Sequence, residues 1–232
     1  MEPGDHVLEI GAGLGSLTVA LAERGADVLA VELDHALVPA LEEVVAPWPN
    51  VRVITGDALR LPWPEILGDD TWTMSSNLPY NVAVPVVMEL LDHARNVAGY
   101  VVMVQREVGE RLVAGAGEPA YGAVSARVAY RADAKLLRRV PPSVFWPIPK
   151  VESVVVRLTP HPPPVAVPSE PLFRVVEEGF AQRRKTMANA LIRLGLDRAG
   201  ASALLERCGL DPRVRAESLS LADFACIAEG LA

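Results

Sequence analysis

Four short stretches near the start of the chain carry side chains that could do chemistry together. A hydrophobic run, Val7–Ile10, leads into the glycine loop Gly11–Gly15, and a helical pattern follows. Glu32 ends the next strand-like run, Asp57 follows a third, and Asn77-Leu78-Pro79-Tyr80 comes after them. This order predicts a site for a methyl donor followed by a pocket that holds a planar amine.

The glycine loop and the acids after it favour a nucleoside ligand without phosphates. Glycine at a strand-to-helix turn lets the backbone approach a ligand, because it has no Cβ. Glu32 lies seventeen residues beyond Gly15, near the ~20 at which an acid bonds ribose hydroxyls in Rossmann-type units. The GxGxG spacing differs from GxGxxG, which weakens the case for a bound pyrophosphate. S-adenosylmethionine is the common ligand of this kind, and Asp57 is expected to accept a hydrogen bond from its adenine amine.

Simpler interpretations exist for each stretch taken alone. The glycine loop could be a tight strand-to-helix turn without a ligand, because short motifs have a high false-positive rate. Asp57 could be a plain turn residue, and Tyr80 a core residue. The four stretches together, in this order and at βαβ spacing, favour the binding site.

Apolar runs alternate with helical patterns through the first ~100 residues, which argues for βαβ units and a parallel sheet. Ser16 is expected to cap the first helix and Asp34 the second, and Pro85 falls in the first turn of the third. The expected strands are 6–10, 27–32, 51–54, 71–76 and 99–104, followed by a late strand pair at 135–140 and 151–158. The expected helices are 15–24, 35–46, 82–93, 107–114 and 121–130.

The pattern predicts an α/β fold: a Rossmann-like class I SAM-dependent methyltransferase domain with a small C-terminal helical domain. We expect the catalytic domain at 1–160, a proline-rich linker at 161–171 and a helical RNA-recognition domain at 172–232. Proline favours extended linker conformations. Short helices with turns near Gly195, Gly209 and Ser218 are expected in the last part.

The charge is unevenly distributed, although the net charge is −7. Residues 1–70 hold 13 acids and 3 bases, so the remainder carries a positive excess. Such a split can mark a nucleic-acid face, although a solvated basic surface, or for 183–185 a solvated helix face, is the alternative. The predicted RNA-binding residues are Arg131, Lys135, Arg138, Lys150, Arg183, Arg184 and Lys185.

Composition limits the compartment and the cofactors. The amino terminus is acidic and polar, unlike a signal peptide, and no apolar run reaches the ~18 residues of a membrane helix. Cys208 and Cys226 form no CxxC motif, so a disulfide is not expected. A cytoplasmic protein is therefore expected. The four histidines are scattered, and no metal is expected.

The chain resembles the small-subunit ribosomal RNA adenine N6,N6-dimethyltransferases of the KsgA type over nearly all of its length. The matching stretches are Glu9–Gly15, Val31–Asp34, Gly56–Ala58, Asn77–Asn81, Val104–Val108, Tyr121-Gly122, Val144–Ser153 and Phe180–Thr186. The last two, Val144–Ser153 and Phe180–Thr186, are much more specific than a methyltransferase glycine loop. Members usually carry a further segment before the position of Gly4 that covers the cofactor, whereas this chain begins at the first strand.

The resemblance implies roles for particular residues. The implied S-adenosylmethionine site, whose product is S-adenosylhomocysteine, comprises Glu9, Gly11, Ala12, Gly13, Glu32, Leu33, Asp57, Ala58 and Asn77. The implied catalytic acceptor site comprises Asn77, Leu78, Pro79, Tyr80 and Phe145, although Phe145 could be plain core. The implied substrate is a pair of adjacent adenosines near the 3′ end of small-subunit rRNA, within the immature small ribosomal subunit, and the simplest state is a monomer.

Three alternatives stay open at this point. An antibiotic-resistance enzyme acting on large-subunit rRNA shares the fold, but commonly has Ile in place of Leu78. An enzyme that methylates glutamine in proteins has Asn-Pro-Pro-Tyr in place of Asn77–Tyr80. A non-catalytic small-subunit assembly factor is the third.

Overall fold

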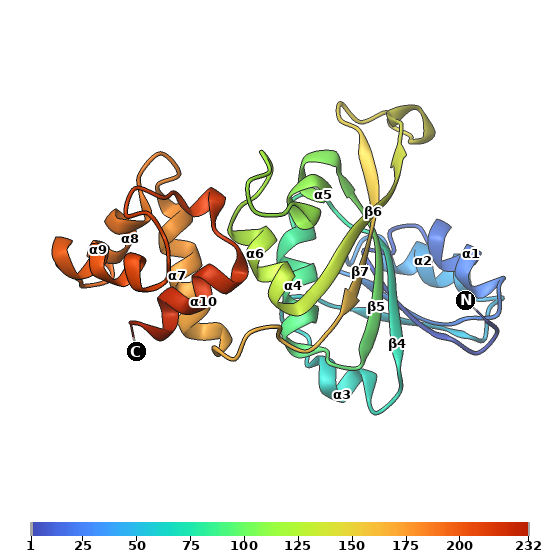
Figure 1. The fold of residues 1–232 in the computed structure, drawn as a ribbon. Helices are drawn as coiled ribbons and strands as arrows, with labels where there is room; N and C mark the ends of the chain where they lie inside the picture. The colour runs from blue at the N-terminus through green and yellow to red at the C-terminus, as the bar shows by residue number, and fades with distance from the viewer. Residues whose placement is uncertain (1, 232) are drawn as a thin grey trace. The chain divides into compact units, whose positions relative to one another are not determined.

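The computed structural model describes residues 2–231, and its first part is built on one seven-stranded sheet of order β3-β2-β1-β4-β5-β7-β6 (Figure 1). The first five strands along the chain are parallel, whereas β7 runs antiparallel to β5. The predicted strands are all confirmed, with ends that differ by three residues or fewer. The strands are β1 (His6–Ile10), β2 (Asp27–Glu32), β3 (Val51–Thr55), β4 (Trp72–Asn77), β5 (Val97–Gln105), β6 (Ala132–Val140) and β7 (Ser153–Pro160).

The helices follow the predicted order, with one addition. The five-residue helix α3 was not expected, and the indole N–H of its first residue, Trp63, donates to the Ala58 carbonyl at 3.0 Å. The helices are α1 (Ser16–Ala22), α2 (Val38–Val45), α3 (Trp63–Leu67), α4 (Ala83–His93), α5 (Arg106–Val113), α6 (Ala123–Arg131), α7 (Ser169–Ala181), α8 (Met187–Arg193), α9 (Arg198–Arg207) and α10 (Leu221–Glu229).

The middle of the sheet is covered on both faces, as parallel strands require. Every residue of β2 except Asp27 is buried. Leu21 of α1 packs with Val7 and Val28, and Leu41 of α2 packs with Ala30. In Figure 1, α1 and α2 lie on one side of the sheet and α4 lies on the other. This arrangement leaves the carboxyl ends of the parallel strands open for a ligand, as in other α/β sheets.

Two predicted helix caps are wrong. The residue before α1 is Gly15, in a left-handed conformation with φ 83°, and in this described stretch no side chain caps the helix. Ser16 is already helical, because the glycine turns the chain directly into the helix. Asp34 accepts from the N–H of Ala36 at 2.9 Å and so closes a turn ahead of α2, which begins after Leu37. Pro85 lies in the first turn of α4, as predicted.

The chain divides into two compact units that differ from the predicted boundaries. The first runs to Gly109 and resumes at 134–160, whereas the second contains 110–133 and everything after residue 160. Residues 110–133 join the helical unit because α6 packs on α7. The helix α7 begins at Ser169, inside the predicted linker.

The helical unit has its own core, in which Phe224, Leu172 and Val176 are fully enclosed. A disulfide joins Cys208, at the end of α9, to Cys226 of α10. The prediction of no disulfide is therefore wrong. The packing of two helices, with Cα atoms 5.9 Å apart, pairs cysteines that lie 18 positions apart in the sequence.

None of the helices within residues 2–231 has the length and apolar character needed to cross a membrane.

Close packing of α5 on the sheet generates a stability prediction. A Cβ at Gly109 would overlap Cγ2 of Val154 and reach within 3.4 Å of Cγ2 of Val156 and Val104. These valines are fully buried. Gly109→Ala should therefore cost about 1–3 kcal/mol through overpacking, only partly offset by up to about 1 kcal/mol of helix propensity. Urea unfolding measures the change.

Gly99→Ala is the matched control, because a Cβ on that β5 residue meets no atom within 4 Å. A Gly109→Ala variant as stable as the wild type would contradict the close packing.

Candidate active site

The glycine loop directs its N–H groups back into the protein. The N–H groups of Gly11 and Ala12 donate to the Val31 carbonyl at 2.8 and 3.3 Å. The N–H of Gly13 donates to Oε2 of Glu32 at 2.7 Å. A phosphate cradle needs free N–H groups in the loop. The geometry therefore supports a ligand without phosphates, as the GxGxG spacing predicts.

Glycine is needed at the first loop position for two reasons. Gly11 has φ 75°, in the left-handed region that disfavours other residues. A Cβ there would also come within 3.0 Å of Cδ of Pro79. The loop thus lies directly against the turn that follows β4, so the predicted donor and acceptor stretches are neighbours.

Glu32 holds the loop and the end of β2 together. Besides Gly13, its carboxylate accepts from the N–H groups of Leu33 at 2.8 Å and Asp34 at 2.9 Å, both through Oε1. A carboxylate offers about four acceptor positions, so roughly one remains, on Oε2. The predicted ribose contact and this structural role therefore fall on the same side chain.

A cavity of about 80 Å³ brings the cofactor residues of three strand ends together with the acceptor turn. Its polar side chains are Glu32 and Asp57, and most of the other walls are apolar. Small-molecule sites commonly combine apolar walls with a few convergent polar groups. The lining residues are Ile10, Gly11, Val31, Glu32, Leu33, Gly56, Asp57, Ala58, Leu59, Pro79, Val82 and Val86.

Asp57 has a local role as well as a place at this cavity. Its Oδ1 accepts from the N–H of Leu59 at 3.0 Å, and its Oδ2 lies 3.5 Å from Nε of the exposed Arg60. Asp57 therefore both stabilises its own turn and lines the cavity. Of the other predicted cofactor residues, Ala12 packs in the core with Leu41. The predicted residues that do not line the cavity are Glu9, Ala12, Gly13 and Asn77.

Glu9 lies beneath the loop and is only 2% exposed. Oε2 of Glu9 accepts from the Thr18 hydroxyl at 2.6 Å. Burial raises the pKa of the Glu9 carboxyl from 4.5 to about 7; the Thr18 hydrogen bond opposes this shift, and the charge of Glu32 adds to it. Thr18 was not singled out from the sequence, because only the packing of α1 on β1 brings it there.

The acceptor turn follows β4. Asn77 is the last residue of β4 and pairs with Met103 of β5. Its exposed side chain has no hydrogen-bond partner among residues 2–231, so the amide is free for a ligand. Leu78 is buried, and its N–H donates to the Met103 carbonyl at 3.1 Å. Pro79 accepts from the N–H of Val82 at 3.2 Å, which closes the turn.

Tyr80 is held by a residue from a distant strand. Its hydroxyl lies 3.1 Å from Oγ of Ser153, the first residue of β7. Ser153 is fully buried, and its contact with Tyr80 was not predicted. The one hint in the sequence was that Ser153 belongs to the Val144–Ser153 stretch, which matches the family specifically. Phe145 is half-buried, directly after a short 3₁₀ turn at Pro142–Val144, and its role opposite Tyr80 stays a prediction.

The predicted RNA-binding residues fall in both units. Lys135 and Arg138 of β6, and Lys150 before β7, are exposed in the first unit. In the second unit, the Arg131 guanidinium lies 4.9 Å from the Tyr130 ring centroid.

Arg183, Arg184 and Lys185 are exposed in the turn between α7 and α8, so the alternative of a helix face is wrong. Arg183 also contacts two groups of its own unit: it donates to the Tyr121 carbonyl at 3.4 Å and lies 3.8 Å from the Glu217 carboxylate. These contacts do not test the predicted role of the three residues in RNA binding, which stays a prediction.

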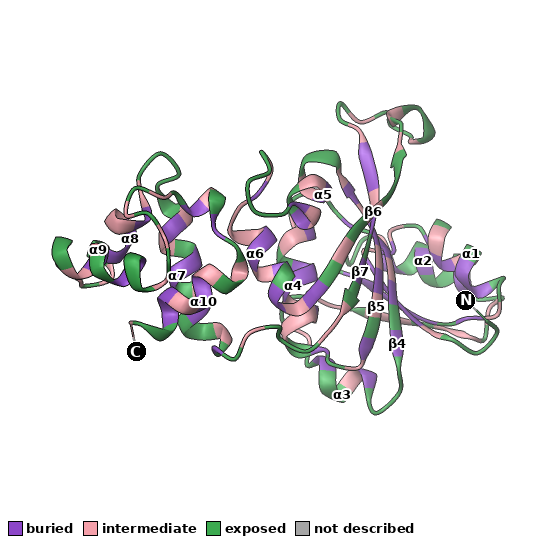
Figure 2. Cartoon of the chain, viewed as in Figure 1, coloured by how far each residue is buried: buried purple, intermediate pink, exposed green. Residues whose placement is uncertain are grey.

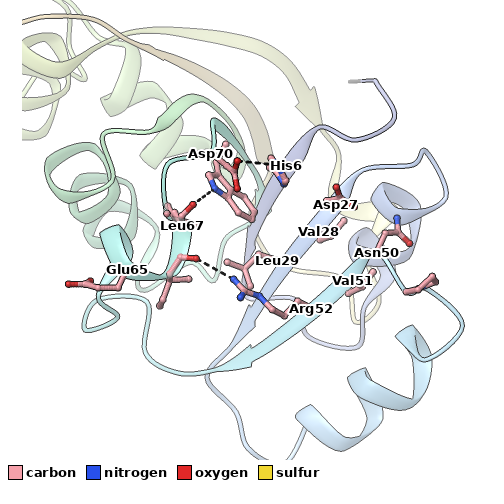
Figure 3. Close-up of a pocket in the computed structure, with 14 residues that line it drawn as sticks. His6, Asp27, Val28, Leu29, Asn50, Val51, Arg52, Glu65, Leu67 and Asp70 are labelled. Atoms are coloured by element: carbon pink, nitrogen blue, oxygen red, sulfur yellow. Dashed lines mark hydrogen bonds and ion pairs between the residues drawn. The ribbon is translucent and has the colours of Figure 1, made fainter.

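A larger cavity, of about 400 Å³, lies at the opposite, amino-terminal ends of β1–β4 (Figure 3). His6 lies there 3.9 Å from Asp70, and Arg52 donates to the Ile66 carbonyl at 3.3 Å. The residues named for the candidate active site are not among its lining residues. We place the active site at the smaller cavity, because ligands of open α/β sheets bind at the carboxyl ends of the strands.

Metal-binding clusters of three or more His, Cys, Asp or Glu side chains are absent from the part of the chain that the structure describes.

The fold and the site define a Rossmann-like class I methyltransferase with a helical C-terminal unit. A dimethyladenosine transferase from Plasmodium falciparum has the same fold, with a TM-score of 0.80 and 24% identity over 98% of this chain and 90% of that one. The 23S rRNA methyltransferase ErmE matches with a TM-score of 0.72 and 22% identity over 100% of this chain and 92% of its own.

The chain belongs to the ribosomal RNA adenine dimethylase family, whose model matches residues 1–232. A relative from Thermobifida fusca is 46% identical over 99% of this chain and 81% of its own length. Another, from Moorella thermoacetica, is 42% identical over 99% of this chain and 83% of its own. Both are named ribosomal RNA small subunit methyltransferase A.

The buried Glu9 predicts a pH-dependent stability. Between pH 4.5 and about 7, the unfolded chain has released the Glu9 proton while the folded protein keeps it. The folded state then binds more protons, so the free energy of unfolding falls as pH rises through this window and levels off above it. The fall is on the order of 3 kcal/mol.

Glu9→Gln should remove this part of the pH dependence and be more stable than the wild type at pH 8. Urea unfolding at pH 5 and pH 8 measures it, with exposed Glu42→Gln as a control for the lost charge. A stability difference between Glu9→Gln and wild type that is the same at both pH values would argue against the buried, protonated carboxyl.

Proposed function

We propose that the protein is a SAM-dependent rRNA (adenine-N6,N6-)dimethyltransferase. It transfers methyl groups from S-adenosylmethionine to N6 of two adjacent adenosines near the 3′ end of small-subunit rRNA during ribosome biogenesis. The observation that carries the proposal is the contact between the two halves of the site. Pro79 of the acceptor turn lines the same cavity as Glu32 and Asp57 and touches the glycine loop.

The residues present fit S-adenosylmethionine. Its adenosine carries a planar amine and two ribose hydroxyls but no phosphate. This matches an apolar cavity with two carboxylates, beside a loop in which the N–H groups of Gly11, Ala12 and Gly13 are already paired. Asp57 would accept from the adenine amine, and Glu32 from the ribose. When bound, the cofactor supplies an electrophilic methyl group on a sulfonium.

The acceptor turn would activate the target nitrogen. Adenine N6 is a poor nucleophile, because its lone pair is delocalised into the ring. Hydrogen bonds from N6–H to the Asn77 side-chain oxygen and the Leu78 carbonyl would favour a pyramidal nitrogen with an available lone pair. Pro79 restricts Leu78 to extended conformations, which would aim that carbonyl.

The base itself would be held by aromatic side chains. Tyr80, fixed by Ser153, and Phe145 would stack on the two faces of an extruded adenine, each contact being worth ~1–3 kcal/mol. A base inside a helix must first be unstacked. No general base is needed before attack, since the proton becomes acidic once N6 is alkylated. Alignment of nitrogen and methyl group then supplies most of the rate.

The substrate class follows from the relatives and the charge. The relatives named above are small-subunit enzymes at 42% identity or more, whereas ErmE shares the fold at 22%. The uneven basic charge supports an RNA partner, which we place in the immature small subunit, in the cytoplasm, with the protein acting as a monomer and without a metal. The names of these relatives favour an enzyme over a non-catalytic assembly factor.

Asn77→Ala tests the proposal. The variant should bind S-adenosylmethionine and RNA but transfer methyl groups at least ~100-fold more slowly, because a positioned group that favours the transition state is lost. Labelled S-adenosylmethionine with unmodified small subunits gives the rate, and calorimetry gives cofactor affinity.

Asn81→Ala, which changes an exposed asparagine of the same turn, is the matched control and should retain activity. Near-normal turnover by Asn77→Ala would refute the acceptor role.

The basic turn generates a second prediction. Replacing Arg183, Arg184 and Lys185 with alanine should weaken RNA binding and flatten its salt dependence by ~0.7 in log–log slope for each lost phosphate contact. Filter binding of small-subunit rRNA across a range of salt concentrations measures it.

Arg24, Arg95 and Arg198 are exposed arginines elsewhere in the chain, and their triple alanine variant makes the same charge change. Equal slopes in the two triple variants would place the RNA away from the basic turn.

A further inference from the structure

The loop between β6 and β7 exposes an unusual amount of apolar surface. Trp146 is 94% exposed, and Val144 and Ile148 are exposed by more than 60% each. Figure 2 shows most of this connection as exposed. Soluble proteins rarely cluster large apolar side chains in solvent unless the patch binds something.

The loop is anchored beside the acceptor turn. Ser153, where the loop enters β7, meets the Tyr80 hydroxyl at 3.1 Å. The preceding residue, Glu152, accepts from Nη1 of Arg106 at 2.7 Å and from the N–H of Arg106 at 2.9 Å. Trp146 follows Phe145, the proposed partner of the target base. The loop is therefore tied to the edge of the sheet where the chemistry is proposed.

The charge around the loop selects the kind of partner. Residues 134–151 contain four bases and no acid: Lys135, Arg138, Arg139 and Lys150. All four are exposed. Three of these bases lie on β6 and Lys150 lies in the loop. Proteins bind unpaired nucleotides with basic side chains on the phosphates and aromatic rings on the bases.

We propose that Trp146 stacks on an unpaired nucleotide next to the target adenosine, which rests on the proposed function. Extruding the target base removes the stacking partner of its neighbour. The indole replaces that partner, and Lys150 and Arg138 neutralise the adjoining phosphates. Trp146 thereby positions the substrate strand while Asn77 and Tyr80 hold the target base.

Kinetics with unmodified small ribosomal subunits test this role. Trp146→Ala should raise KM for the subunits about tenfold, as loss of one stacked base implies, and leave kcat and cofactor affinity within about threefold. Trp146→Phe keeps an aromatic face and should stay near wild type. Trp146→Leu keeps apolar area without an aromatic face and should resemble Trp146→Ala.

Two kinetic results would overturn the proposal. An unchanged KM in Trp146→Ala would mean that the indole does not touch the substrate. Leucine performing as well as phenylalanine would identify an apolar protein surface as the occupant, in place of a base.

Fluorescence separates this inference from the proposed function. Trp63 and Trp72 are buried and Trp48 is half-buried, so Trp146 is the freely exposed tryptophan of residues 2–231. A short single-stranded oligoribonucleotide with two adjacent adenosines should quench wild-type emission, and Trp146→Phe should lose that quenching while still binding the RNA. Quenching by the oligoribonucleotide without methyl transfer to unmodified small subunits would refute the proposed function alone. Methyl transfer to the subunits by a protein that binds the oligoribonucleotide without quenching would refute the stacking role alone.

Discussion

The candidate site depends on one buried carboxylate. Glu32 accepts hydrogen bonds from the N–H groups of Gly13, Leu33 and Asp34, which lie on the two sides of the cleft between the glycine loop and the end of β2. Burying a carboxylate is costly unless hydrogen bonds offset the lost hydration, and charge-assisted bonds to backbone N–H groups do this well. These bonds hold the glycine loop against the residues that follow β2, and Glu32 and Leu33 themselves line the cavity. The same carboxylate lines the cavity, so its structural role and its proposed role in binding fall on one side chain.

The donor and acceptor parts of the site are joined through the backbone and not through long side chains. A Cβ on Gly11 would come within 3.0 Å of Cδ of Pro79, and Oγ of Ser76 accepts from the N–H of Ile10 at 2.9 Å. These two contacts fasten β4 to β1 just where each strand ends. A methyl transfer needs donor and acceptor in line within a narrow tolerance. For the proposed reaction, a rigid connection between the two strand ends would supply that alignment without large movements.

Much of this could be predicted from the sequence, because it is encoded locally. The first two parallel strands are mainly apolar runs. The glycine loop, Glu32, Asp57 and Asn77 each lie at or just past the carboxyl end of a parallel strand, so the topology brings them together at one edge of the sheet. The contacts that were missed depend on packing between distant segments. Thr18 reaches Glu9 only when α1 packs on β1, Ser153 reaches Tyr80 only when β7 joins the sheet, and Cys208 meets Cys226 only in the folded helical unit. Residues 110–133 belong to the helical unit for the same reason, because α6 packs on α7, which is distant in the sequence.

Methyl transfer to ribosomal particles is the most direct test of the account. Unmodified small subunits and, in parallel, large subunits would be incubated with the protein and labelled S-adenosylmethionine, and the RNA would be digested to nucleosides. The account predicts N6,N6-dimethyladenosine from small subunits alone, with two modified residues per particle. Label in large-subunit RNA, or no dimethyladenosine from either particle, would contradict it.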